Sequence, residues 1–196
     1  FDAITEFDFK GAALAMVPAI YHNKYRAKVG ISQDDITYNA GIMAFDLAAW
    51  RANQCRMRLI RGMQEDPQML SFAPDQSLAI KVLQKDLTQL PLRFNFSTLY
   101  SLFSYKDISK MFKCREAEMF KQEDIDEAYR NIAVYHFIEL QVGKPREKDS
   151  VHPKKFLWKE YYDKSRWSDL PAPKVKLPLL LKLQRITYKL MPKKIY

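Results

Sequence analysis

The sequence predicts an α/β fold with a mixed sheet, because short apolar segments of strand length alternate with longer helical segments along the chain. Composition supports this prediction: of 196 residues, 47% are hydrophobic and 28% are charged, which is enough apolar material for one sizeable core. Only 5 glycines and 10 prolines occur, so the disordered and fibrous classes of protein are excluded.

The first half of the chain contains two predicted strands and two predicted helices. Residues 12–17 are an apolar run whose short length favours a strand, although its alanines would also suit a helix. Residues 36–45 are rich in β formers and contain Gly41, which predicts a strand with a bend near that glycine. An aspartate is positioned to cap a helix over 46–64, and a second, well-buried helix is expected to begin at Asp75.

The second half contains weaker strand signals. Residues 87–96 indicate a short or edge strand, because a proline interrupts them. Residues 98–131 are helical or loop-like, and 132–137 form the clearest short strand. An aromatic helix is predicted over 153–165, and the prolines within 171–173 open a linker.

Positive charge is concentrated at the C-terminal end. The net charge is +9, yet no acidic residue follows Asp169, and without the seven basic residues beyond it the net charge would be +2. Those seven are Lys174, Lys176, Lys182, Arg185, Lys189, Lys193 and Lys194. We therefore predict one domain over residues 1–170 and a basic tail over 171–196 that meets an anionic surface.

The tail also has the pattern of an amphipathic helix, with a basic stripe beside an apolar one. The two stripes consist of Leu179, Leu183, Ile186 and Leu190 and of Lys182, Arg185 and Lys189. The pattern predicts attachment to a membrane surface through residues 174–196, and the alternative is a helix packed on the protein's own core. Deleting 174–196 is expected to abolish binding to anionic vesicles and to leave the activity of the rest of the protein intact.

The cysteines indicate a reducing compartment. Cys55 and Cys114 lie far apart and in no metal-binding spacing, so a disulfide framework is not expected and a cytoplasmic protein is predicted. No apolar run reaches the roughly 18 to 20 residues that span a bilayer. The first residues lack the basic start of a signal peptide, and the missing initiator methionine indicates a fragment.

The predicted strand 132–137 ends near His136, where α/β folds bind their ligands, and imidazole suits Mn²⁺ or Zn²⁺. The alternative is a hydrogen-bonded histidine at a sheet edge, since one histidine is not a metal site. Gly143-Lys144-Pro145 follows it. The glycine lets the backbone approach a ligand, the lysine supplies a cation for a phosphate, and the proline stiffens the turn, but such a tripeptide is common by chance.

Two further polar segments have the same ambiguity. The carboxylate of Asp75 can accept hydrogen bonds from sugar hydroxyls, and the amide carbonyl of Gln76 can face an electron-poor carbon. The alternative is a capping aspartate followed by an exposed glutamine. Asn39-Ala40-Gly41 marks either a binding strand or a simple bulge.

In this order, these segments resemble the C-terminal two thirds of retaining glycosyltransferases of family 8, including bacterial lipopolysaccharide galactosyl- and glucosyltransferases. The matching segments are Tyr38-Asn39-Ala40-Gly41, Asp46-Leu47-Ala48-Ala49-Trp50-Arg51, Asp75-Gln76-Ser77, Leu90-Pro91-Leu92-Arg93-Phe94-Asn95, His136-Phe137, Lys144-Pro145 and Leu157-Trp158-Lys159-Glu160-Tyr161-Tyr162. The resemblance implies that residues 1–170 are the C-terminal portion of a GT-A fold.

The sequence departs from the family pattern in three respects. Lys144 follows His136 by eight positions where the family has six, so a longer phosphate loop is expected. Ser77 stands where the family has a second acid. The family's Asp-x-Asp motif, which holds the metal together with the histidine, is absent and is expected before Phe1, so the fragment is expected to be inactive alone.

The resemblance implies that the intact protein transfers galactose or glucose from a UDP-sugar to a lipopolysaccharide, capsule or other glycan acceptor, with retention and with Mn²⁺ or Mg²⁺. It implies a catalytic role for Gln76, donor-sugar binding by Asn39, Ala40 and Asp75, diphosphate binding by Gly143 and Lys144, and metal ligation by His136. A lipid-linked acceptor would place the protein on the inner face of the cell membrane. The sequence does not specify the sugar, acceptor, linkage or oligomeric state.

A competing interpretation is a non-enzymatic basic module that binds a membrane or nucleic acid through the tail. Nucleic acid is disfavoured, because no recognition motif occurs and the chain outside the tail is nearly neutral. Binding of a UDP-sugar with and without Mn²⁺ distinguishes the two interpretations.

Overall fold

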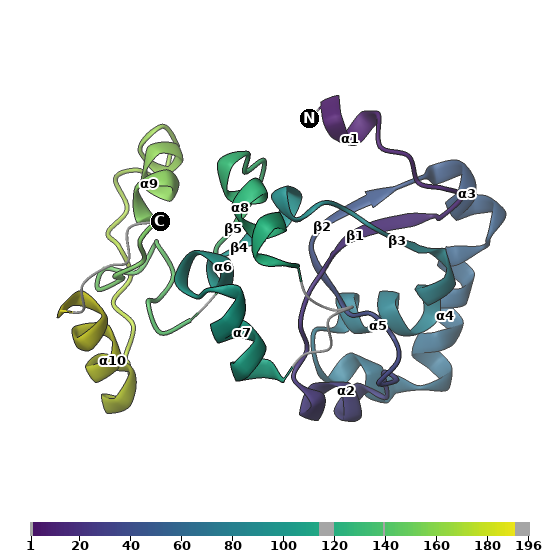
Figure 1. Cartoon of the computed structure of the whole chain (residues 1–196), viewed down its shortest axis with the longest axis horizontal. Helices are drawn as coiled ribbons and strands as arrows, with labels where there is room; N and C mark the ends of the chain where they lie inside the picture. Colours follow the sequence, from purple (N-terminus) through teal and green to yellow (C-terminus); the bar gives the residue numbers. More distant parts are fainter. Residues whose placement is uncertain (1, 114–119, 139, 191–196) are drawn as a thin grey trace. The chain divides into compact units, whose positions relative to one another are not determined.

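The computed structural model describes residues 2–113, 120–138 and 140–190, and it has the mixed α/β character that the sequence predicts (Figure 1). The α-helices are α1 (Asp2–Thr5), α2 (Asn23–Val29), α3 (Leu47–Ala52), α4 (Cys55–Glu65), α5 (Pro74–Leu83), α6 (Thr98–Leu102), α7 (Tyr105–Phe112), α8 (Gln122–Arg130), α9 (Lys155–Asp163) and α10 (Leu179–Leu190). The strands are β1 (Leu14–Pro18), β2 (Tyr38–Phe45), β3 (Leu87–Gln89), β4 (Phe96–Ser97) and β5 (Tyr135–His136). The 3₁₀ helices are η1 (Pro67–Ser71), η2 (Gln84–Asp86) and η3 (Leu92–Asn95).

Strand β1 lies between β2 and β3 in the larger sheet. It runs antiparallel to β2 and parallel to β3, so the predicted mixed sheet is confirmed. All five residues of β1 are buried, which explains its uninterrupted apolar sequence. The strand prediction for residues 12–17 is therefore correct, and the helix alternative is not adopted.

Strand β2 contains the predicted irregularity. Met16 of β1 pairs with Met43, but the next residue, Val17, pairs with Asn39, so residues 40–42 interrupt the ladder. A bulge of this kind changes the direction in which the neighbouring side chains point. The bulge coincides with Gly41, where the sequence predicts a bend.

The principal core forms where α2, α4 and α5 pack beside the larger sheet (Figure 1). Its buried members are Ala13, Leu14, Met16, Tyr21, Val29, Ile31, Tyr38, Cys55, Ala79, Ile80 and Leu83. Helix α5 contributes a nearly continuous buried surface, as its apolar sequence predicts. Cys55 is a free thiol in this core, whereas Cys114 lies outside the described residues.

The helix predicted over 46–64 is two helices in the structure. Asp46 caps the first one as expected, accepting the backbone N–H groups of Ala48 and Ala49 at 2.9 and 3.0 Å. Helix α3 then ends, because Gln54 adopts a left-handed conformation with φ of 51° that an α-helix cannot contain. The sequence pattern was continuous across this break, so the prediction was wrong in length.

Two strand predictions were also too long. In the segment 132–137 only Tyr135–His136 is a strand, because the N–H groups of Ala133 and Val134 donate to the carbonyl oxygen of Arg93 and not to a strand ladder. The segment 87–96 divides into β3, η3 and the start of β4, with its proline between the first two. The proline ends β3 early, because proline has no N–H to donate to a strand ladder.

The chain divides into two compact units. The first contains Phe1–Phe96 and Phe103–Tyr135, and the second contains Ser97–Leu102 and His136–Tyr196. Helix α10 therefore groups with the segment that begins at His136. Within the described part of the chain, none of the helices combines the length and the apolar character needed to cross a bilayer.

Candidate functional site

The predicted site residues fall into both units. Asn39, Ala40, Asp75 and Gln76 belong to the first unit, and His136, Gly143 and Lys144 belong to the second. We describe each group by itself.

In the first unit, Asn39 is held in one orientation by two donors. Its Oδ1 accepts the backbone N–H of Gly41 at 2.8 Å and the Nδ2 group of Asn95 at 2.7 Å. Because a backbone N–H can only donate, the atom that faces Gly41 must be the amide oxygen of Asn39, and Asn95 must then present its nitrogen. The Nδ2 group of Asn39 is thereby directed away from both partners.

Gln76 lies against the same strand. Its Oε1 accepts the backbone N–H of Ala40 at 2.7 Å, and its side chain is buried, with 7% of its surface exposed. The alternative of an exposed glutamine is therefore excluded. Because a backbone N–H can only donate, the atom that faces Ala40 is the oxygen of the Gln76 amide. The structure thus brings together three of the predicted residues, Asn39, Ala40 and Gln76, where β2 meets α5.

The start of α5 explains how Gln76 reaches that position. Pro74 occupies the first turn, where its missing N–H is tolerated. Ser77 is fully buried and donates its hydroxyl to the carbonyl oxygen of Phe72 at 2.6 Å, which ties the helix to the preceding segment. Asp75 is exposed in the first turn, where a carboxylate interacts favourably with the helix dipole. Ser77, which replaces the family's second acid, therefore has a structural role.

In the second unit, His136 is the last residue of β5 and is half-buried. Among the described residues, its buried Nδ1 atom has no hydrogen-bond partner. Burial also lowers the pKa of the imidazole from its usual 6.5, so the ring is neutral at neutral pH. A neutral ring with an unpartnered nitrogen is the form in which histidine binds a metal ion.

A buried chain of hydrogen bonds fixes the main chain at His136. The backbone N–H of Lys154 donates to Nδ1 of His152 at 3.1 Å, so the ring proton of His152 is on Nε2. That atom lies 3.0 Å from Oγ1 of Thr98, which in turn donates to the carbonyl oxygen of His136 at 3.3 Å. Burial lowers the pKa of His152 to about 4, so this chain is neutral under ordinary conditions.

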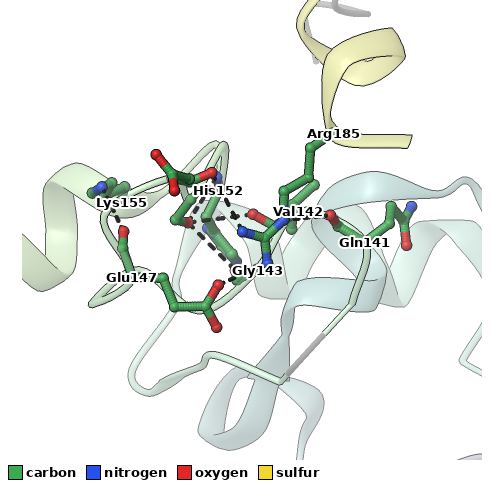
Figure 2. Close-up of polar contacts among 9 residues, drawn as sticks. Gln141, Val142, Gly143, Glu147, His152, Lys155 and Arg185 are labelled. Carbon is green, nitrogen blue, oxygen red and sulfur yellow. Dashed lines mark hydrogen bonds and ion pairs between the residues drawn. The ribbon is translucent and has the colours of Figure 1, made fainter. Parts of the chain in front are cut away.

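The segment after β5 forms a loop that contains Gly143 and Lys144. Gly143 has φ of 76°, a left-handed conformation that favours glycine, and Lys144 is half-buried. The loop is closed by two backbone bonds, from Gly143 to Leu140 at 2.9 Å and from Val151 to Val142 at 3.0 Å. Figure 2 shows that the guanidinium of Arg185 lies inside this loop.

The described residues do not form a complete metal site. Within that part of the chain, no group of three histidine, cysteine, aspartate or glutamate side chains lies close enough together to hold a metal ion. His136 is therefore a single candidate ligand, and its unpartnered nitrogen fits that role. The resemblance to family 8 predicts the other ligands before Phe1.

Several residues near the predicted positions were not identified from the sequence as having a role. Asn95 occurs in one of the matching segments, but no sequence signal indicates its bond to Asn39, and none indicates the burial of Glu147 or His152. Arg185 was assigned to the exposed basic stripe, but it is buried, with 6% of its surface exposed. No sequence pattern distinguishes it from Lys182 and Lys189, because the acid that pairs with it lies 38 residues earlier.

Comparison with solved structures shows the same fold. The galactosyltransferase LgtC, solved in complex with donor and acceptor sugar analogues, has a TM-score of 0.57 and 14% identity, over 93% of this chain and 59% of that one. An active-site mutant of LgtC, with a glutamine changed to glutamate, gives 0.56 and 15% over 91% and 58%. The bifunctional glycosyltransferase WbbM without ligand gives 0.56 and 12% over 95% and 32%.

These comparisons confirm the predicted GT-A architecture, and the chain spans less than two thirds of each of these structures. Among curated proteins, no sequence match was found. The sequence model of glycosyl transferase family 8 matches residues 1–145, which is well over half of the chain. On this match, the protein is a member of glycosyl transferase family 8.

Proposed function

We propose that the protein transfers a hexose, galactose or glucose, from a UDP-sugar to a glycan acceptor with retention at the anomeric carbon. The observation that carries this proposal is the bond between Gln76 Oε1 and the N–H of Ala40, which holds the candidate catalytic amide against the candidate sugar-binding strand. LgtC also has a glutamine at its active site. That likeness supports a catalytic role for Gln76.

The residues of the first unit would act on the donor sugar. A carbonyl oxygen has two lone pairs, so the bond to Ala40 leaves Gln76 Oε1 able to face a second group. Facing the anomeric carbon, it would stabilise the positive charge that develops there as the bond to the diphosphate breaks. The exposed carboxylate of Asp75 and the amide nitrogen of Asn39 would bind the sugar hydroxyls.

The residues of the second unit would act on the diphosphate. Gly143 would allow close approach of the backbone, and the ammonium group of Lys144 would neutralise the negative charge that grows on the departing UDP. His136 would hold a divalent cation, Mn²⁺ or Mg²⁺, as one of its ligands. When bound, such a cation supplies Lewis-acid stabilisation of a phosphate oxygen.

The proposal is tested with the protein as it is made in the cell, including any residues before Phe1. Transfer from UDP-galactose and UDP-glucose is measured with and without Mn²⁺, for the wild type and for Gln76→Ala. We expect donor binding to persist and turnover to fall sharply in the variant, whereas the exposed Gln64→Ala control keeps full activity. Unchanged turnover in Gln76→Ala would remove the glutamine from the reaction, and no UDP-sugar binding at all would refute the function.

A second proposed property is attachment to the inner face of the cell membrane through α10. The helix exposes its apolar stripe: Leu179 is 73% exposed, Leu183 51%, Ile186 52% and Leu190 78%. Lys182 and Lys189 are also exposed. Arg185 is not available to lipid headgroups because it pairs with Glu147, and Lys193 and Lys194 lie outside the described residues.

This attachment is tested by sedimentation with anionic phosphatidylglycerol vesicles. Each basic residue near such a surface contributes on the order of 1 kcal/mol, so Lys182→Gln with Lys189→Gln should weaken binding by about thirtyfold at low salt. Undiminished sedimentation of this double variant would show that the helix does not face the lipid.

A further inference from the structure

Arg185 is an exception on its helix. Most of α10 faces solvent, but the Arg185 side chain enters the loop of residues 141–149 and is almost completely buried (Figure 2). Its Nε donates to the carbonyl oxygen of Gln141 at 3.3 Å and its Nη1 to that of Asp149 at 3.4 Å. The planar, forked guanidinium therefore spans both ends of the loop, which a lysine ammonium could not do.

The same guanidinium forms an ion pair in the middle of the loop. Nη2 donates to Oε2 of Glu147 at 2.7 Å, and Glu147 is itself only 4% exposed. The carbonyl oxygen of Glu147 also accepts the Nζ group of Lys155 at 3.1 Å and the N–H of Ser150 at 3.2 Å. A buried ion pair adds little net stability, but removing one partner leaves an uncompensated charge. The pair therefore selects one arrangement of the loop.

Gly143 connects this ion pair to the residue that follows it, Lys144. A Cβ atom at Gly143 would come within 2.6 Å of Cζ of Arg185 and within 2.6 Å of Oε2 of Glu147. These distances are too short for real atoms, so the backbone of Gly143 lies directly against the ion pair. Any movement of Arg185 therefore changes the space next to the backbone that precedes Lys144.

We propose that Arg185 is a positioning residue for the diphosphate-binding loop: from α10, it holds residues 141–149 in the shape that presents Gly143 and Lys144 to the nucleotide. This inference rests on the proposed function of the loop. It makes α10 part of the donor site in addition to any contact with a membrane. It also changes the expectation from the sequence, because deleting 174–196 would remove Arg185 and impair transfer even to a soluble acceptor.

The test compares three variants in the protein as it is made in the cell. Arg185→Lys keeps the charge but loses the fork, and the double variant Arg185→Met with Glu147→Leu removes both charges, so that no unpaired charge is left buried to prevent folding. Gln184→Met, at an exposed position of the same helix outside the apolar and basic stripes, is the control. The measurements are hydrogen exchange of the 141–151 amides, and the KM for UDP-sugar, the KM for acceptor and kcat.

We expect faster exchange at 141–151 and a donor KM raised about tenfold in the double variant, with Arg185→Lys between it and the wild type. In the double variant, the KM for acceptor should stay unchanged and kcat should stay within about threefold of the wild-type value. The control variant should match the wild type in every measurement. A general loss of folding would not produce this combination. If the wild type binds UDP-sugar and the double variant binds it equally well, the inference is overturned while the proposed function stands. If no form binds UDP-sugar, the proposed function fails, and the positioning role fails with it.

Discussion

Arg26 and Arg185 are both buried, and each holds a loop beside predicted site residues, but they act over different distances along the chain. Arg26 is 1% exposed and donates from Nη1 to the carbonyl oxygens of Ser32 and Asp35 at 2.8 and 2.9 Å, and from Nη2 to Oγ1 of Thr37 at 3.3 Å. These acceptors lie 6 to 11 residues after it, in the loop that enters β2. Arg185 instead reaches acceptors 36 to 44 residues before it.

The surroundings of the two arginines also differ. Arg26 belongs to α2, whose Val29 is part of the principal core. Arg185 belongs to α10, most of whose leucines are exposed, so its polar contacts contribute much of the attachment of that helix. A buried arginine in a local loop therefore supports the folding of its unit, whereas one on a peripheral helix controls the shape of a distant loop. The following predictions test this difference, from the largest expected effect to the smallest.

The largest effect is expected for Arg26→Met. The substitution removes a buried guanidinium that donates to Ser32, Asp35 and Thr37, and a hydrogen bond from a charged group contributes about 1.5 to 3 kcal/mol. We expect the free energy of unfolding to fall by at least about 3 kcal/mol, measured by urea denaturation. Lys24→Met, on the exposed side of the same helix, should change it by less than about 0.5 kcal/mol. An Arg26→Met protein as stable as the control would show that this loop does not depend on the arginine.

The second prediction concerns the loss of stability at low pH that His152 causes. His152 has a pKa of about 4 in the folded protein and 6.5 as the usual value, so the unfolded chain binds more protons between these two pH values. Its contribution to stability is therefore complete above about pH 6.5 and is lost as the pH falls toward 4. The full loss is about 3 kcal/mol.

This prediction is checked by comparing thermal unfolding of the wild type and His152→Asn at pH 7 and pH 4.5. Asparagine can accept the N–H of Lys154 but does not titrate in this range. The variant should lose less stability than the wild type on acidification. Equal losses in both proteins would assign the acid sensitivity to other groups.

The third prediction concerns Gly143→Ala, which disturbs the contact between Gly143 and Arg185 by changing the loop residue and leaving the arginine in place. A side chain at φ of 76° is strained, and its Cβ would displace the guanidinium. We expect a loss of about 1 to 2 kcal/mol in the free energy of unfolding. Hydrogen exchange at 141–151 should rise as it does when Arg185 is replaced. A substituted loop that exchanges at the wild-type rate would show that the backbone of Gly143 does not depend on Arg185.

Local patterns in the sequence predicted much of the fold. The apolar run at 12–17, the glycine in 36–45 and the cap at Asp46 each act through neighbours in the chain, and the structure confirms all three. The break at Gln54 was missed because no glycine or proline marks it. The strand at 132–137 was overestimated because its N–H groups donate to the distant Arg93.

The candidate site shows the same limit. The sequence indicated Gln76 by its place at a helix start, but its burial and its bond to Ala40 depend on a strand 36 residues away. The pairing of Arg185 with Glu147 could not be predicted from the sequence either, since both residue types are common on exposed surfaces. Polar pairs between distant parts of the chain leave no local signal in the sequence, whereas a capping residue and a short apolar run do.

The smallest change in stability is expected for Asn95→Ala. The substitution removes the bond from Asn95 Nδ2 to Asn39, but it also removes a buried Oδ1 that has no partner among the described residues. The lost bond and the removed unsatisfied oxygen offset each other, so the free energy of unfolding should fall by less than about 1 kcal/mol. The amide of Asn39 would keep only the N–H of Gly41 and would be free to rotate. We therefore expect the KM for UDP-sugar to rise at least about threefold while the melting temperature of the protein hardly changes. A residue that mattered only for folding would give the opposite combination, and a large loss of stability with an unchanged KM would reject the role of Asn95 in orienting Asn39.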